Sequence, residues 1–250
     1  MIDLHPPEHT VHTWRDFFIH IATICVGLLI AIGLEQSVEA IHRQHERAEL
    51  RESLNRESHL IVRNCERLDA AMAAESAWED QVEILVLASA RTHRTIPAIP
   101  PVPLGAFNYD TPVDSVYLAA KASNKLELLS QQETEAYGEL DFTVDTTAIA
   151  SQRHRDAAFN ISQTLRAGAI DSPGMSPGLK PNVFMTNLQN ITLSPASLAE
   201  FYKAIVRAQG DRSQLLFAAR YARGAATALL QGERDLPKIQ AAERQFNNLP

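Results

Sequence analysis

An uncharged, strongly apolar run near the N-terminus limits what this chain can fold into more than any other feature. The run extends from Phe17 to Leu34, and its 18 residues include no Asp, Glu, Lys or Arg. At about 1.5 Å of rise per residue, a helix over this run would be roughly 27 Å long, close to the hydrocarbon thickness of a bilayer. We therefore predict an N-terminal tail over residues 1–16 and a transmembrane helix over residues 17–35.

Two other kinds of segment contain apolar runs: a cleaved signal peptide and a buried core helix. A signal peptide has a basic N-terminal region and a small-residue cleavage site. Here the tail carries a single basic residue, Arg15, against three acidic ones, and residues 34–40 continue a helical pattern with no such site. Core helices seldom continue for 18 residues without a charge, so the membrane helix is the favoured interpretation.

Small residues mark one face of this helix. Thr23, Gly27 and Ala31 recur at four-residue spacing, which lets two transmembrane helices approach closely, although Gly is frequent in membrane helices in general. We predict a helix-dimer face at these residues, and with it a homodimer. Trp14 and Arg15 precede the run, and we expect them at the membrane interface, where Trp is enriched.

Basic residues near the ends of the run indicate its orientation. Arg43, Arg47 and Arg51 follow it, whereas Arg15 alone precedes it. The excess of basic residues usually lies on the cytoplasmic side, so we expect a cytoplasmic C-terminal domain. Acidic residues alternate with these arginines, and long domains are translocated largely regardless of charge, so the opposite orientation stays open.

The chain beyond the run has the pattern of an all-α protein. Residues 34–96 contain neither Gly nor Pro, and apolar residues at three- and four-residue spacing predict a long amphipathic helix over 36–91, continuous with the membrane helix. Ser58, Glu75 and Glu79 interrupt its apolar seam, so a coiled coil is an alternative rather than a requirement.

Further helices follow a Pro-rich connector over residues 92–112. We predict one helix that starts at Thr111-Pro112, a second that starts at a capping box of Ser130 and Glu133, and a third that starts at Ser194-Pro195. No stretch shows the alternation of a strand. Three to four helices with apolar faces predict an antiparallel bundle in which residues 113–232 complete the domain, with an irregular loop at 168–194 and a C-terminal tail at 233–250.

Inward-facing residues of these helices follow from the spacing. In the helix after Ser130 we expect Ala136, Tyr137, Leu140, Val144, Ala148, Phe159 and Leu165 to face the core. Five aromatic residues are either core or the lining of a cleft between helices, and the core is favoured because nothing in the spacing demands a cavity. They are Trp78, Tyr109, Tyr117, Tyr137 and Tyr202.

Composition excludes several functions. The formal net charge of -7 argues against nucleic acid, which requires a concentrated basic surface. Two cysteines, Cys25 and Cys65, make no disulfide framework. The sequence holds no phosphate loop and no dinucleotide-binding fingerprint.

Two partial motifs lack the context that their chemistry needs. Residues 174–178 match the GxSxG pattern of a serine nucleophile, but Pro177 follows the serine and has no N–H for an oxyanion hole. Glu39 and His42 form an ExxH pair, but a di-iron bundle requires a second such pair. A solvated, charged helix face is the favoured interpretation of the pair. We therefore predict no catalytic residue, no cofactor and no metal.

Several of these segments resemble one family. The sequence WRDFF at residues 14–18, GLLIAIGLEQ at 27–36 and the segment 111–122 are similar to uncharacterised bacterial single-pass membrane proteins. The resemblance is most specific over residues 14–60 and looser over 110–165. It implies a location in the bacterial cytoplasmic membrane and no assigned activity.

These observations favour a membrane-anchored helical interaction or scaffold protein. Its expected partners are the lipid bilayer, a second copy of the chain and an unknown protein. The alternative is a membrane-tethered sensory or small-molecule-binding bundle with the loop 168–194 as a lid, and an enzyme is the least favoured hypothesis.

Overall fold

The computed structural model describes residues 14–92, 96–100, 109–169, 188–191 and 193–247. Within these ranges the chain is almost entirely helical, which confirms the predicted all-α class. The main helices are α1 (Trp14–Thr92), α2 (Ser115–Ala122), α3 (Gln131–Ala169), α4 (Pro195–Leu230) and α5 (Leu236–Asn247). A short 3-10 helix, η1 (Lys125–Leu128), and two four-residue strands, β1 (Ile96–Ile99) and β2 (Leu188–Ile191), complete the elements. The chain divides into two compact units, residues 1–51 and 52–250.

The described part of the first unit, residues 14–51, belongs to helix α1. Every side chain from Trp14 to His45 is exposed, and the most apolar 18-residue window near the N-terminus has a mean hydropathy of 2.5 with none of it buried. By length and composition this helix could therefore span a membrane. Because α1 begins at Trp14 and ends at Thr92, the predicted continuity between the apolar run and the long amphipathic helix is confirmed.

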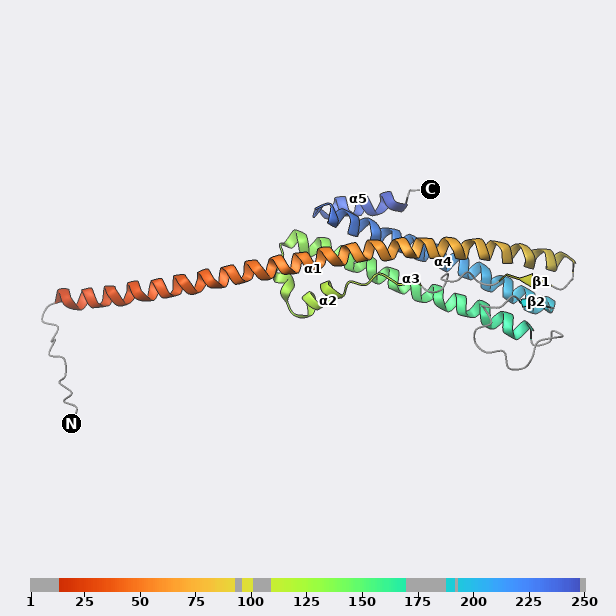
Figure 1. Ribbon diagram of the computed structural model, residues 1–250, viewed down its shortest axis with the longest axis horizontal. Coiled ribbons are helices and arrows are strands. Elements are labelled where there is room, and N and C mark those ends of the chain that lie inside the picture. Colours follow the sequence, from red (N-terminus) through yellow and green to blue (C-terminus); the bar gives the residue numbers. More distant parts are fainter. Residues whose placement is uncertain (1–13, 93–95, 101–108, 170–187, 192, 248–250) are drawn as a thin grey trace, which may run out of the picture. The chain divides into compact units, whose positions relative to one another are not determined.

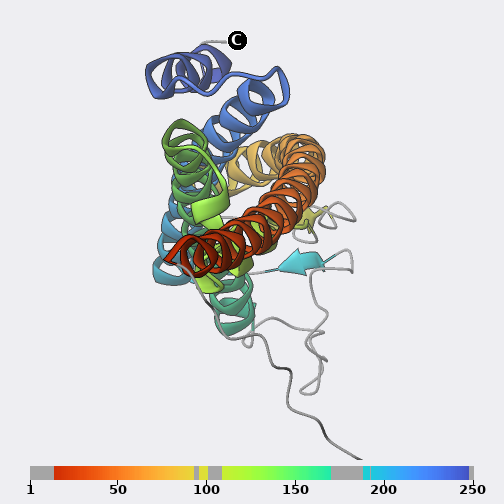
Figure 2. The same cartoon turned by 90° about the vertical axis from the view of Figure 1, so that its left-hand side faces the viewer.

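The second unit is a bundle in which α3 and α4 pack along the part of α1 that follows Glu52 (Figure 1). One apolar cluster joins all three helices, which confirms the predicted bundle. Its members come from α1 (Trp78, Val82, Val86), α3 (Ala157, Ile161) and α4 (Phe201, Ala204, Ile205, Ala208). Viewed along its length, the unit shows α5 stacked beyond α4, with the start of α3 beside them (Figure 2).

The predicted antiparallel bundle is confirmed for α4, whereas α1 and α3 are the parallel pair within it. Arg223 contacts Glu66 and Arg212 contacts Glu79, both at 2.7 Å, so α4 runs opposite to α1. Helices α1 and α3 instead run in the same direction (Figure 1). The chain between them returns along the bundle, from Tyr109 beside the middle of α3 to α2 beside its start.

Two of the three predicted helix starts are confirmed. Ser130 and Glu133 form a reciprocal capping box, with Ser130 N donating to Glu133 Oε2 at 2.9 Å. Ser194 Oγ accepts from Ser197 N at the start of α4. The start at Thr111-Pro112 is wrong, because α2 begins at Ser115.

The start of α2 is capped from another helix. Val116 N and Tyr117 N donate to the two carboxylate oxygens of Glu57 in α1, at 2.6 and 3.2 Å. The Ser115 hydroxyl donates to the same side chain. A carboxylate from α1 thus satisfies the first free amides of α2, a role that a local capping residue usually fills.

The two strands pair antiparallel, with Ile96 opposite Ile191 and Ile99 opposite Leu188. They lie in the two segments that the sequence indicated as connector and irregular loop. Residues 170–187 and 192 of the predicted loop 168–194 lie outside the described residues. The GxSxG match at 174–178 is among them. Most of the N-terminal tail lies outside the described residues as well.

Some side chains do not face the predicted way. Phe159 is 63% exposed and Ala148 is exposed, although both were expected in the core. Glu75 and Glu79, which were expected to interrupt the apolar seam, are completely buried. The other inward positions of α3 whose side chains are described are buried. The aromatic core is confirmed at four positions (Trp78, Tyr109, Tyr117, Tyr137), whereas Tyr202 is half-buried.

Candidate functional site

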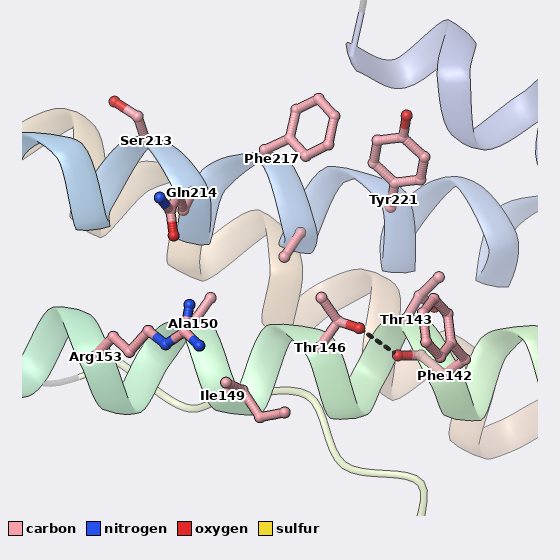
Figure 3. Close-up of a pocket in the computed structure, with 11 residues that line it drawn as sticks. Phe142, Thr143, Thr146, Ile149, Ala150, Arg153, Ser213, Gln214, Phe217 and Tyr221 are labelled. Atoms are coloured by element: carbon pink, nitrogen blue, oxygen red, sulfur yellow. Dashed lines mark hydrogen bonds between the residues drawn. The ribbon is translucent and has the colours of Figure 1, made fainter.

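The candidate functional site is an open, apolar groove between α3 and α4, with a cavity volume of about 820 Å³ (Figure 3). Eleven side chains line it. Helix α3 contributes Phe142, Thr143, Thr146, Ile149, Ala150 and Arg153, and helix α4 contributes Ser213, Gln214, Phe217, Ala218 and Tyr221. We call this the α3–α4 groove.

Helical spacing explains why these residues share one face. In α3, Phe142, Ile149 and Arg153 are separated by seven and four positions. In α4, Gln214, Phe217 and Tyr221 are separated by three and four positions. These spacings place each set on one side of its helix. Because α3 and α4 are antiparallel, Phe142 lies at the same end of the groove as Tyr221, and Arg153 at the same end as Gln214 (Figure 3).

The groove exposes large apolar side chains. Phe142 is 67% exposed, Ile149 50% and Phe217 55%. The ring of Phe217 lies 4.7 Å from that of Tyr221, so the α4 side forms an aromatic wall. Fully burying an apolar side chain of this size contributes about 1.5–3 kcal/mol, and the bundle leaves half or more of each of these three side chains in contact with water.

The polar residues of the groove offer little to a polar ligand. Thr146 Oγ1 donates to Phe142 O at 2.8 Å, and Thr143 Oγ1 donates to Leu140 O at 2.9 Å, so both hydroxyls bond to their own helix. The buried residues Ala150 and Ala218 form part of the lining and keep it deep. Among the eleven lining residues, Arg153 is the charged one.

A polar cluster lies inside the bundle, on the side of α3 that faces away from the α3–α4 groove. His154 Nε2 lies 3.0 Å from Glu75 Oε1 of α1, and both side chains are fully buried. His154 Nδ1 lies 2.9 Å from the hydroxyl of Tyr109, which is 8% exposed. The imidazole thus joins α1, α3 and the returning connector. Because these groups are closed off from solvent, we assign them a structural role.

One turn along α1, Glu79 is also fully buried and contacts Arg212 of α4 at 2.7 Å. Burial raises the pKa of Glu79 to about 8, with the carboxylate of Glu75 adding to the shift and Arg212 opposing it. The sequence contains a signal for this cluster, because two acids at four-residue spacing within an apolar seam require buried partners.

The residues of the predicted dimer face lie on the exposed part of α1. Thr23, Gly27 and Ala31 are all exposed, and a Cβ at Gly27 would meet nothing within 4 Å. Trp14 begins α1, and its ring contacts those of Phe17 and Phe18. Arg15 is exposed beside it.

The ExxH element lies on an exposed part of α1. His42 pairs with Glu46 at 3.6 Å and His45 with Glu49 at 3.2 Å, while Glu39 pairs with Arg43 at 3.1 Å. Each is an i,i+4 pair along one helix. The side chains of the ExxH element are therefore engaged with successive neighbours rather than gathered around one point.

Comparisons with models of protein families, with curated proteins and with solved structures each found no match.

Proposed function

We propose that this chain is a non-enzymatic interaction module, tethered to a membrane by the N-terminal part of α1, whose second unit binds another protein in the α3–α4 groove. The single observation that supports it most is the exposure of Phe142, Ile149 and Phe217 around one cavity. Contiguous exposed apolar patches of this kind mark interaction or ligand sites.

The location forms part of the same proposal. We place the module in the bacterial cytoplasmic membrane, as a single-pass protein with its C-terminal unit in the cytoplasm. The apolar helix and the three arginines that follow it, Arg43, Arg47 and Arg51, support this orientation. The exposed face of Thr23, Gly27 and Ala31 supports a homodimer through the membrane helix.

The second candidate function is a membrane-tethered sensor that binds a small apolar molecule. A cavity of about 820 Å³ falls within the usual range for ligand sites, and its lining is mainly apolar. The groove is open along its length, however, which suits an elongated occupant better than an enclosed ligand. A metabolite that raises the Tm of the full chain, but not that of an Ile149→Glu variant, would favour this candidate.

Site-specific photo-crosslinking tests the proposed function. A photoreactive amino acid replaces Ile149 in the groove and, as a matched control, Ile84 of α1, which is 68% exposed and lies outside the groove. We expect irradiation of intact cells to attach another protein at position 149 and not at position 84. Equal adducts at both positions, or none at position 149, would contradict the proposal.

A further inference from the structure

Helix α5 shows how the α3–α4 face is already used at one end. Gly224 of α4 lies so close to α5 that a Cβ there would be 2.7 Å from Glu243 Cα. On the α3 side, Gln240 Nε2 lies 3.3 Å from Glu139 Oε1. Ile239 of α5 is fully buried. A short amphipathic helix therefore occupies this end of the face.

The α3–α4 groove is the continuation of the seat of α5. Gly224 lies three residues beyond Tyr221 and seven beyond Phe217, and Glu139 lies three before Phe142. These spacings keep each pair on one side of its helix. Helix α5 runs back along α4, and the guanidinium of Arg223 lies 5.4 Å from the ring of Phe246 near its end. The groove residues Tyr221 and Phe217 therefore follow Gly224, the point where α5 packs most closely, along the same side of α4.

The dimensions of the groove fit a helix. Its α3 wall extends from Phe142 to Arg153, a distance of roughly 16 Å at 1.5 Å per residue, or three turns. An amphipathic helix laid in such a groove places apolar residues at i, i+3, i+4 and i+7 against it. Those residues would meet Phe142, Ile149 and Phe217.

A second copy of the chain does not suit the groove. In a parallel pair, Arg153 would face Arg153 and α5 would face α5, which would hold the two faces apart. In an antiparallel pair, Arg153 of each copy would face the end of the groove at Phe142 and Tyr221 of the other. None of the lining residues is acidic, so neither pairing gives Arg153 an opposite charge.

We infer that the α3–α4 groove binds an amphipathic helix of a different protein, about three turns long and in line with α5, with an acidic residue beside Arg153. This inference rests on the proposed interaction function and names the kind of partner. The continuity with the seat of α5, the three exposed apolar side chains and the single cation of the lining support it.

A library of labelled 12-residue amphipathic helical peptides tests the inference. The peptides carry Leu, Ile or Phe at the apolar positions and either Glu or Lys at one end, and binding to the full chain in lipid nanodiscs is followed by fluorescence anisotropy. We expect Ile149→Glu to weaken the best binder at least about tenfold, because a charge enters an apolar contact. Ile84→Glu, the matched control, is expected to leave binding unchanged.

The charge preference provides a second readout that a merely sticky surface would not produce. We expect the wild-type chain to favour Glu-ended over Lys-ended peptides by about threefold, the range of an exposed ion pair, and Arg153→Glu to reverse that preference. Absence of binders, an unchanged charge preference in Arg153→Glu, or self-association lost on Ile149→Glu would overturn the inference. A protein crosslink at position 149 without any peptide binding would refute the helical partner and leave the interaction module standing.

Discussion

The two sides of helix α3 have opposite characters, and each is the reverse of what its environment would favour. On the inner side Thr147, Ser151 and His154 are fully buried, whereas on the outer side Phe142 is 67% and Ile149 50% exposed. His154 has partners on two other elements, Glu75 of α1 and Tyr109 of the connector, and Thr147 Oγ1 donates to Thr143 O of its own helix, so these groups contribute to folding. The exposed apolar groups lack an equivalent explanation within the bundle, which is why we assign them to binding.

The largest expected effect comes from the inner side. We expect His154→Ala to lower the free energy of unfolding by about 3 kcal/mol, because it leaves the carboxylate of Glu75 and the hydroxyl of Tyr109 buried without the imidazole. Urea unfolding of the full chain in detergent, followed by circular dichroism, measures it. The matched outer variant, Ile149→Ala, should change stability by no more than about 0.5 kcal/mol. Similar losses for both variants would remove the contrast between the two sides.

The seat of α5 is the next most sensitive point. We expect Gly224→Ala to cost about 2 kcal/mol, because its Cβ would overlap the backbone of Glu243 and push α5 from the α3–α4 face. Gly210→Ala on the same helix is the control, since a Cβ there would meet nothing within 4 Å. Hydrogen exchange of α5 should accelerate in the first variant and not in the second. Unchanged exchange would show that a methyl group at position 224 fits between α4 and α5 without displacing α5.

Removal of the Glu57 cap of α2 should have a smaller effect on the free energy of unfolding. Glu57→Ala should lower the free energy of unfolding by about 1 kcal/mol, because the amides of Val116 and Tyr117 lose their acceptor. Glu57→Gln retains one acceptor oxygen and should recover part of the loss. A neutral Glu57→Ala variant would mean that solvent caps α2 equally well.

These results separate what the sequence could predict from what it could not. The capping box at Ser130 and the start of α4 at Ser194 are local, so a few neighbouring residues specify them. The burial of Glu75 depends on His154, 79 positions away, and the cap of α2 depends on Glu57. Such pairs are invisible to local patterns.

The groove could not be predicted for a related reason. The sequence predicts Phe159 in the core of α3, and Phe142 and Ile149 share a separate face of that helix at seven-residue spacing. Spacing identifies a shared face but does not say whether another helix covers it. In α3, His154 lies in the interior because Glu75 of α1 and Tyr109 of the connector satisfy its ring nitrogens.

The smallest expected effect is on pH dependence. Burial raises the pKa of Glu79 to about 8 from an ordinary value of 4.5. An acid whose pKa is raised by folding stabilises the folded state below its unfolded pKa, and this contribution is lost as the pH rises from about 4.5 to 8. Burial also raises the pKa values of Asp114 and Glu243 to about 7, which acts in the same direction.

Stability of the full chain should therefore fall as the pH rises from 5 to 8, and Glu79→Gln should flatten part of that slope. Thermal unfolding at a series of pH values measures it. A stability that rises over this interval in the wild-type chain would mean that Glu79 is ionised in the folded protein.

Thiol labelling in membranes tests directly whether the α3–α4 groove binds a partner protein. Ile149→Cys and Ile84→Cys are each placed in a chain whose native thiols are removed by Cys25→Ser and Cys65→Ala, and maleimide labelling is compared in native membranes and in purified protein. If the groove binds a partner protein, the thiol at position 149 is protected in membranes and labelled after purification, while that at position 84 is labelled in both. Equal labelling of position 149 in membranes and in purified protein would contradict the account.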